Sequence, residues 1–95
     1  DYIQKTVATH YSISLEDLKS KSRKRELVTA RQIAMYFAKK YTSHSLKSIG
    51  GYFGGRDHST VIHALQTINN MLDTEPHFKL SFQDIQRRIK FKVPV

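Results

Sequence analysis

Apolar residues recur at intervals of three and four along most of this chain, and no alternating strand pattern of any length occurs. The first such stripe, which predicts a helix within residues 1–12, consists of Ile3, Val7 and Tyr11. Ser14 is typical of a helix N-cap, and Asp17 follows it at the capping-box spacing. We therefore expect a second, short helix that runs through Leu18.

The pattern stops at residues 19–26, which contain no apolar side chain, five basic residues and one acidic residue. A segment of this kind cannot contribute to a core, so we expect a solvated basic loop. Helical spacing resumes over residues 28–41, whose predicted inner face consists of Ala30, Ile33, Ala34, Phe37 and Tyr41. Ser45 can then cap a short helix over residues 46–53.

Two more helices complete the pattern. The first is expected to start near Asp57, and its apolar positions fall within an arc of roughly 60° at about 100° per residue. Residues 74–76 end it with a proline, and another helix follows before a tail over residues 93–95. The residues expected to be buried are Val61, Leu65, Ile68 and Leu72 in one helix and Phe78, Phe82, Ile85 and Ile89 in the other. We predict a single all-α domain over residues 1–95.

Residues 46–72 match the general helix-turn-helix pattern of a short helix, a glycine turn and a second helix. Gly50 is small where the two helices must cross, and Gly54 can adopt a positive φ at the turn. The turn is one residue longer than in many such units, and we expect Gly55 to absorb the extra residue. The apolar contacts between the two helices are expected from Ile49 and Val61.

Composition narrows the functional classes. The 16 Lys and Arg residues exceed the 8 Asp and Glu residues, giving a formal net charge of +8. This excess favours a phosphate-bearing partner, nucleic acid first and an anionic membrane surface second. The absence of cysteine excludes disulfides and thiolate metal sites.

No apolar run approaches the roughly 18–20 residues of a membrane span, and nothing resembles a signal peptide. Because the chain begins with Asp1 rather than Met, we expect it to be a piece of a longer protein.

Candidate chemistry is concentrated in residues 54–64, where a glycine turn leads into a helix start that carries Arg, Asp, His, Ser and Thr. The positive end of the helix dipole suits an anionic partner, and side chains that exchange hydrogen bonds suit the edges of DNA bases. A glycine-linked helix pair alone is common in small all-α domains. The net charge and the lack of a core role for residues 56–60 therefore favour DNA binding.

These residues, with residues 30–35 upstream and 44–46 between, closely resemble the C-terminal DNA-binding domain of the DnaA family, the bacterial chromosomal replication initiators. The resemblance covers nearly the whole chain, and the sequence Arg-Asp-His-Ser/Thr-Thr-Val is highly specific to that family. It implies a Trp-repressor-like helical domain that binds DnaA boxes, sites close to TTATCCACA, at replication origins. It also implies a cytoplasmic, nucleoid-associated bacterial protein that oligomerises on DNA, although this domain alone is expected to be monomeric.

In this family an ATP-binding AAA+ domain precedes the DNA-binding domain, and residues 1–12 would continue from it. ATP and Mg²⁺ are expected only for that domain, so no cofactor is expected for this fragment. The resemblance places the start of the second helix-turn-helix helix, the recognition helix, in the major groove. Its expected base contacts come from Asp57, His58, Ser59 and Thr60.

The chemistry of each side chain fits that placement. A carboxylate at Asp57 suits a cytosine amino group, and Thr60 can place its methyl group against a thymine methyl. Ser59 stands where many relatives have threonine, so it keeps the hydroxyl and lacks the methyl group. For Asp57 a plain N-cap is the alternative, and for His58 the alternative is a solvent-exposed histidine. His63 lies roughly opposite Val61 and either approaches DNA or is an idle surface residue.

The basic loop supplies the second expected contact, because in the family an arginine here enters the narrow, A·T-rich minor groove beside the box. Alignment gives this role to Arg23, with Lys24 and Arg25 as alternatives because the loop lacks an apolar anchor. Other matched positions are expected to hold the phosphate backbone, which fixes register rather than sequence. These positions are Arg25, Arg31, Gln32, Lys39, Leu46, Lys47 and Arg56.

Other functions are disfavoured by spacing. Residues 50–55 are glycine-rich but lack the Lys-Ser/Thr of a phosphate loop, and His58 and His63 are five residues apart instead of the four that align two metal ligands. We expect no catalytic site and no metal site. Three alternatives remain: an acidic-phospholipid-binding surface, an unrelated helix-turn-helix transcriptional regulator, and a protein-docking module. Lipid binding would use the first helix and Arg87, Arg88, Lys90 and Lys92, but would gain nothing from an anion at Asp57.

Overall fold

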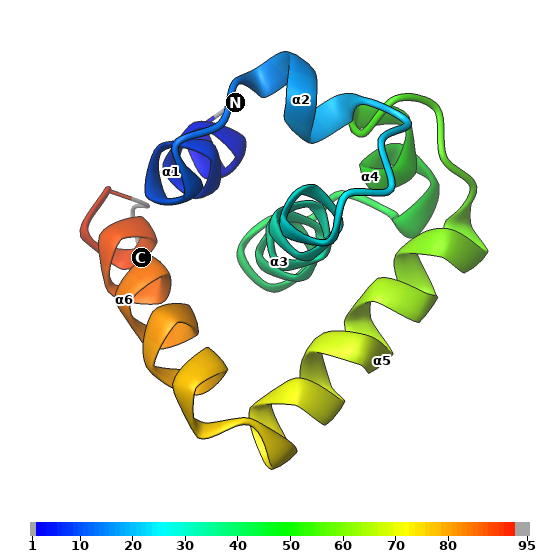
Figure 1. Ribbon diagram of the computed structural model, residues 1–95. Helices are drawn as coiled ribbons and strands as arrows, with labels where there is room; N and C mark the ends of the chain where they lie inside the picture. The colour runs from blue at the N-terminus through cyan, green and yellow to red at the C-terminus, as the bar shows by residue number, and fades with distance from the viewer. Residues whose placement is uncertain (1, 93–95) are drawn as a thin grey trace.

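The computed structural model describes residues 2–92, and the side chains of residues 2–90. The described chain folds into six helices, which confirms the predicted all-α class. In chain order they are α1 (Tyr2–Tyr11), α2 (Leu15–Lys19), α3 (Arg25–Tyr41), α4 (Leu46–Tyr52), α5 (His58–Thr74) and α6 (Pro76–Lys92). Helix α3 lies in the middle, and the other helices surround it (Figure 1). The predicted tail over residues 93–95 lies outside the described residues.

Helix ends follow the predicted caps. The Ser14 hydroxyl accepts a hydrogen bond from the Asp17 backbone N–H at 3.0 Å, and the Ser45 hydroxyl accepts one from the Ser48 N–H at 3.1 Å. Both bonds satisfy a backbone donor that has no partner inside its helix. Helix α6 begins at Pro76, a position where the missing N–H costs nothing. The predicted break between the last two helices is therefore confirmed.

The boundary between the basic loop and α3 differs from the prediction. Helix α3 begins at Arg25, three residues before the expected start, and the Val28 N–H donates to the Lys24 carbonyl at 2.9 Å. Arg25 and Glu26 are exposed on this first turn, whereas Leu27, which the predicted helix left out, is buried. The basic loop, predicted over residues 19–26, is therefore limited to residues 20–24.

The core forms where α3 meets the helices around it. Phe37 of α3 stacks on Phe82 of α6 with 4.7 Å between the ring centres, and Tyr36 meets the edge of the same ring. Such aromatic pairs add to the stabilisation from burial. Within the described residues no helix is long and apolar enough to cross a membrane.

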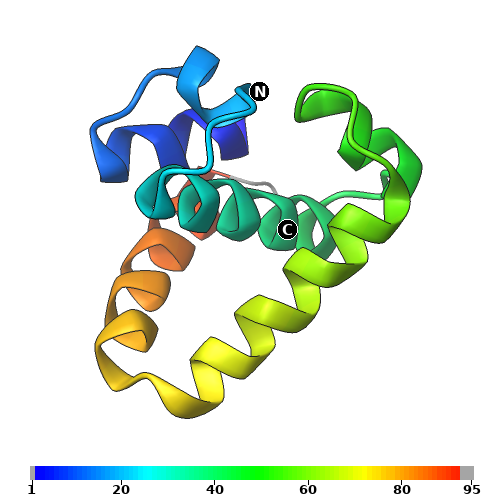
Figure 2. The same ribbon diagram turned by 45° about the vertical axis from the view of Figure 1, so that its right-hand side comes forward.

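Three of the eight residues that we predicted to be buried in α5 and α6 are only partly so: Leu65, Leu72 and Phe78. Tyr41 of the predicted inner face of α3 is also only partly buried. Leu72 and Phe78 lie beside the turn between α5 and α6, a corner that projects away from the other helices (Figures 1 and 2). On α5, Ala64 takes part in the inner face, with 2% of its surface exposed, so Leu65 lies at the edge of the buried stripe. The spacing of apolar residues along the chain could not reveal that no other described helix covers this corner.

Candidate nucleic-acid interface

The helix-turn-helix is closed at Gly50, where α4 and α5 cross. A Cβ atom at this position would collide with the carbonyl oxygen of Arg56 and lie 3.3 Å from that of Asp57. The Gly50 carbonyl also accepts hydrogen bonds from the Phe53 and Arg56 N–H groups, at 3.1 and 2.9 Å. Backbone therefore packs directly on backbone here, which confirms the predicted role of this glycine.

The turn itself contains two glycines in the left-handed region, a conformation that we predicted for Gly54. The φ angles of Gly54 and Gly55 are 86° and 74°, a conformation that other residues adopt only with strain. A Cβ atom at Gly54 would lie 2.5 Å from the carbonyl oxygen of Lys19, the last residue of α2. The turn thus packs against the end of α2, directly before the basic loop, although the two segments are far apart in sequence.

Asp57 caps α5, and one of its carboxylate oxygens makes all of the capping bonds. Its Oδ1 accepts hydrogen bonds from the Thr60 backbone N–H at 3.0 Å, the Ser59 hydroxyl at 2.8 Å and the Thr60 hydroxyl at 3.2 Å. No hydrogen bond among the described residues uses Oδ2. The capping role is confirmed, and it leaves the second oxygen available to a partner.

The same hydrogen bonds lower the pKa of Asp57 below its ordinary value of 3.8, the Thr60 backbone N–H contributing most. Because the folded chain favours the carboxylate, the stabilisation from the cap is present at neutral pH. We expect it to be lost as the pH falls through the lowered pKa. A ¹³C NMR titration of the carboxyl group measures this pKa, and Asp57→Asn should remove the corresponding part of the pH dependence of stability. A carboxyl that titrates at or above 3.8 would contradict this assignment.

The first turn of α5 presents a polar face to solvent. His58, Ser59 and Thr60 are exposed, whereas Val61 behind them is fully buried. His63 is also exposed, on the same helix one turn later. We predicted that residues 56–60 have no core role. Residues 57–60 are exposed as predicted and accessible to a partner, whereas Arg56 is half-buried.

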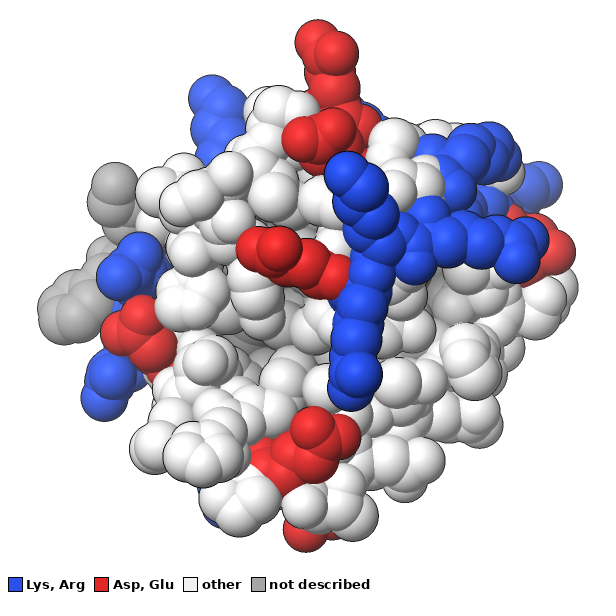
Figure 3. Space-filling view, in the orientation of Figure 1, with Lys and Arg blue, Asp and Glu red and all other residues white. Residues whose placement is uncertain are grey.

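Basic side chains collect beside this face. Lys21, Arg23 and Lys24 of the basic loop are exposed, as is Arg25 at the start of α3. In the space-filling view many Lys and Arg side chains gather at the upper right, over the region where the α2–α3 loop meets the start of α5 in Figure 1 (Figure 3). The basic loop and the first turn of α5 thus share one end of the molecule.

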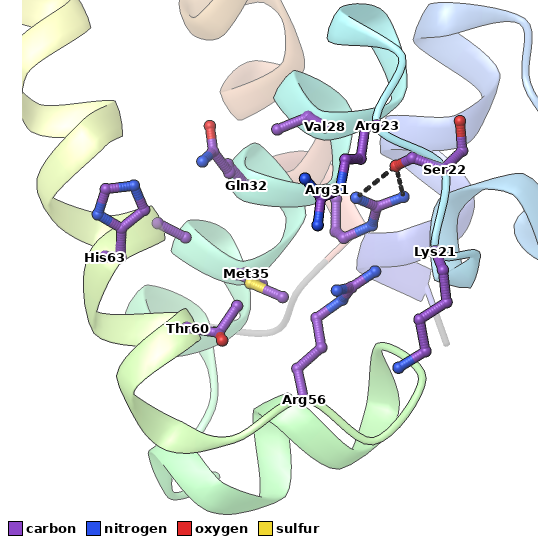
Figure 4. Close-up of a pocket in the computed structure, with 11 residues that line it drawn as sticks. Lys21, Ser22, Arg23, Val28, Arg31, Gln32, Met35, Arg56, Thr60 and His63 are labelled. Atoms are coloured by element: carbon purple, nitrogen blue, oxygen red, sulfur yellow. Dashed lines mark hydrogen bonds between the residues drawn. The ribbon is translucent and has the colours of Figure 1, made fainter.

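A cavity of about 730 Å³ lies between the basic loop, α3 and α5 (Figure 4). It is lined by Lys21, Ser22, Arg23, Val28, Arg31, Gln32, Met35, Arg56, Thr60, His63 and Ala64. Four of these residues are Lys or Arg, and none is Asp or Glu. Positive charge around the cavity is therefore not neutralised by acidic side chains in its lining, which suits an anionic group.

Arg31 lies deeper than the sequence predicts, with 6% of its surface exposed. Its Nε donates to the Leu18 carbonyl at 2.8 Å, and both terminal nitrogens lie 3.4 Å from the Ser22 carbonyl (Figure 4). Burial lowers the pKa of this guanidinium, and the charge of Arg56 lowers it further. Arginine nevertheless stays charged in proteins. Arg31 therefore has a structural role that the sequence did not indicate, and its contact with a DNA phosphate stays a prediction.

Arg56 makes a similar contact from the other side of the cavity. One terminal nitrogen donates to the Ser20 carbonyl at 2.6 Å, whereas its buried Nε has no partner among the described residues. A buried N–H without a partner is costly, so this group can take an acceptor from a ligand. Sequence reasoning missed the carbonyl contacts of both arginines, because a backbone acceptor leaves no trace in residue type.

The remaining predicted phosphate contacts are spread over two helices. Gln32 is half-buried and lines the cavity, whereas Lys39 is exposed in the last turn of α3. Leu46 is half-buried and Lys47 exposed, both in the first turn of α4. No cluster of three His, Asp or Glu side chains within the described part of the chain is placed to hold a metal ion.

Comparison with known proteins agrees with this geometry. The family model described as the bacterial DnaA protein helix-turn-helix matches residues 1–68. Chromosomal replication initiator proteins DnaA from Flavobacterium psychrophilum, Chlorobaculum tepidum and Bacteroides thetaiotaomicron are 49%, 48% and 44% identical to this chain, over 94%, 93% and 97% of its length. The chain spans 18–20% of the length of these curated relatives.

A solved structure supports the same assignment at the level of the fold. A crystal structure of a DNA replication initiation factor superposes with a TM-score of 0.85 and 32% sequence identity. The superposition covers 98% of this chain and 28% of that chain. Together with the matching family model, it shows that the chain belongs to the bacterial DnaA helix-turn-helix family.

Proposed function

We propose that this chain binds duplex DNA sequence-specifically at DnaA boxes during the initiation of bacterial chromosome replication. One observation carries the proposal. The polar first turn of α5 and the basic loop are both exposed, and they lie beside the same cavity, whose lining contains basic but no acidic side chains. Side chains that exchange hydrogen bonds can recognise base edges, while the cavity accommodates the phosphates between them.

In this proposal α5 enters the major groove by its first turn. The Oδ2 atom of Asp57 accepts a hydrogen bond from a cytosine amino group, while Oδ1 continues to cap the helix. Thr60 places its methyl group near a thymine methyl, and His58 and Ser59 contact neighbouring base edges. Capping and base recognition therefore coexist on one carboxylate.

The basic loop occupies the adjacent minor groove. We assign the inserted side chain to Arg23, because it is exposed on the loop and also lines the cavity, whereas Arg25 belongs to the first turn of α3. A narrow A·T-rich minor groove has the strongly negative potential that attracts a guanidinium. Arg23 therefore recognises the A·T-rich end of the site.

Phosphates on either side of these grooves would be held by the other exposed or cavity-lining groups. A guanidinium or ammonium group supplies charge, and the backbone N–H at a helix start supplies a directed donor. We assign these contacts to Arg25, Arg31, Gln32, Lys39, Leu46, Lys47 and Arg56. They position the domain on DNA without selecting sequence.

The proposal is tested by fluorescence anisotropy with a duplex that carries one DnaA box and a scrambled duplex of equal length. We expect the box duplex to bind at least about 10³-fold more tightly, the lower end of specificity for a protein of this kind. Anionic phospholipid vesicles added as competitor should not displace the box duplex at matched phosphate concentration. Equal affinity for the two duplexes would contradict sequence-specific binding, and efficient displacement by vesicles would favour a lipid surface.

Two substitutions of Asp57 separate its cap from its base contact. Asparagine caps a helix as well as aspartate does, but it would direct an amide N–H, a donor, at the cytosine donor. Asp57→Asn should therefore keep the stability of the fold and lose about 1–3 kcal/mol of discrimination at one base pair. Asp57→Ala should lose both that discrimination and about 1 kcal/mol of stability. The measurements are anisotropy with single base-pair variants of the box and urea unfolding.

One outcome would contradict a base contact from Asp57. If Asp57→Asn discriminates all base pairs of the box as the unmodified chain does, the carboxylate acts only as a cap.

A further inference from the structure

The basic loop and the end of α2 before it are attached to the rest of the domain through backbone carbonyl groups. Carbonyl groups of alternate residues accept hydrogen bonds from two arginines that lie outside the loop: Arg31 binds those of Leu18 and Ser22, and Arg56 binds that of Ser20. The two arginines come from α3 and from the turn before α5. Three successive alternate carbonyls are thus held from two sides.

Hydrogen bonds between residues of the loop determine its conformation but do not attach it to the neighbouring helices. The Ser22 N–H donates to the Ser20 hydroxyl and the Lys24 N–H donates to the Ser22 hydroxyl, both at 3.2 Å. The start of α3 has no side-chain cap, and no residue of segment 20–24 is apolar. The two arginines are therefore the main described attachment of the loop to α3 and to the helix-turn-helix.

The geometry requires arginine at both positions. The guanidinium of Arg31 reaches two carbonyls with different nitrogens, and that of Arg56 uses a terminal nitrogen, which extends farther than the amine of a lysine. Arg31 is 6% exposed, so most of its surface faces protein rather than a partner. These contacts exist without DNA, and they join the segment before α5 directly to the basic loop.

We propose that Arg31 and Arg56 are positioning residues that fix the basic loop relative to the recognition helix before DNA binds. The proposal rests on the proposed function: Arg23 can enter the minor groove while Asp57 contacts the major groove only if the loop and α5 keep a set separation. Holding this separation in the unbound domain removes an ordering cost from binding. The two arginines thereby set how many base pairs separate the major-groove contacts of α5 from the A·T pairs that the loop recognises.

The first test does not involve DNA. Trypsin cuts after Lys21, Arg23 and Lys24 when the loop opens, and cleavage follows the population of the open state when closing is fast. We expect Arg31→Lys and Arg56→Lys each to raise the ratio of loop cleavage to cleavage in α6 roughly tenfold, because each loses hydrogen bonds from a charged donor. Mass spectrometry of the fragments gives this ratio, and α6 reports any general loss of stability. Lys79→Gln, which removes an exposed charge on α6, should leave the rate of loop cleavage unchanged.

The second test measures recognition with a box duplex and a duplex in which the A·T pairs at the end of the box are replaced by G·C pairs. The unmodified chain should prefer the first by about tenfold, and Arg23→Ala should lose this preference. Arg31→Lys should lose it too while keeping its charge. Lys39→Gln, an exposed position on the same helix, should weaken binding to both duplexes equally and leave loop cleavage unchanged.

The two tests distinguish two kinds of failure. Equal loop cleavage in Arg31→Lys, Arg56→Lys and the unmodified chain would overturn the positioning role, whatever the DNA results. Faster cleavage with an unchanged preference for A·T pairs would also overturn it, because the attachment would then not serve recognition. An unmodified chain that binds box and scrambled duplexes equally would instead contradict the proposed function.

Discussion

Gly50→Ala is expected to lower the free energy of unfolding by about 3 kcal/mol or more, a large part of the stability of a domain of this size. The added methyl group would meet the carbonyl of Arg56, and a backbone carbonyl cannot rotate away as a flexible side chain can. Relief would require α4 and α5 to separate, which breaks the hydrogen bond from the Arg56 N–H to the Gly50 carbonyl. Urea unfolding followed by circular dichroism measures the change.

Gly51 provides a matched control at the next residue of the same helix. A Cβ atom there would have nothing within 4 Å, so Gly51→Ala should leave the stability unchanged or raise it by up to about 1 kcal/mol. The two variants differ only in which face of α4 carries the methyl group. If both variants unfold at the same urea concentration, the close crossing of α4 and α5 does not limit the fold.

The second large effect is expected from salt. With on the order of six phosphate contacts, affinity for a box duplex should fall roughly 10³-fold between 50 and 200 mM monovalent salt, because binding releases the counterions condensed on DNA. The unneutralised cavity and the exposed basic loop are the physical reason for so steep a dependence. Anisotropy titrations at four or five salt concentrations give the slope of log affinity against log salt.

The same salt titrations can count individual phosphate contacts. Lys47→Gln in the first turn of α4 should lower the slope by about one unit, as expected for one lost phosphate contact, and should not change base preference. Lys79→Gln on α6 should leave the slope unchanged. A salt response that is flat in the unmodified chain would exclude the phosphate contacts assigned to the basic surface.

Sequence patterns predicted the helical elements well, because apolar spacing and capping residues act over one or two turns. Ser14 and Ser45 cap the helices that they were expected to cap, and the crossing at Gly50 follows from the glycine alone. The exposed polar face of α5 was also predictable, since residues with no core role had to be exposed. These features depend on residues close together in sequence.

The rest of the site depends on contacts between distant segments. Nothing in the residue types indicates that Arg31 is buried against the Leu18 carbonyl, because every residue offers such an acceptor. The start of α3 at Arg25 was missed because its first two residues are charged and exposed, although Leu27 in the same turn is buried. Partial burial of Leu72 and Phe78 depends on the projecting corner of α5 and α6, which only the three-dimensional arrangement reveals.

The hydrogen-bond pattern at Asp57 also fixes which way the hydroxyl protons point. Ser59 and Thr60 both donate their protons to the Asp57 Oδ1 atom, so their outward lone pairs, together with Oδ2, can only accept. These groups of the first turn therefore require donors from a partner, and the exocyclic amino groups of cytosine and adenine are the donors of the major groove. Phosphate oxygens, which only accept, would be repelled. This polarity directs these groups toward bases and leaves the backbone to the arginines and lysines around them.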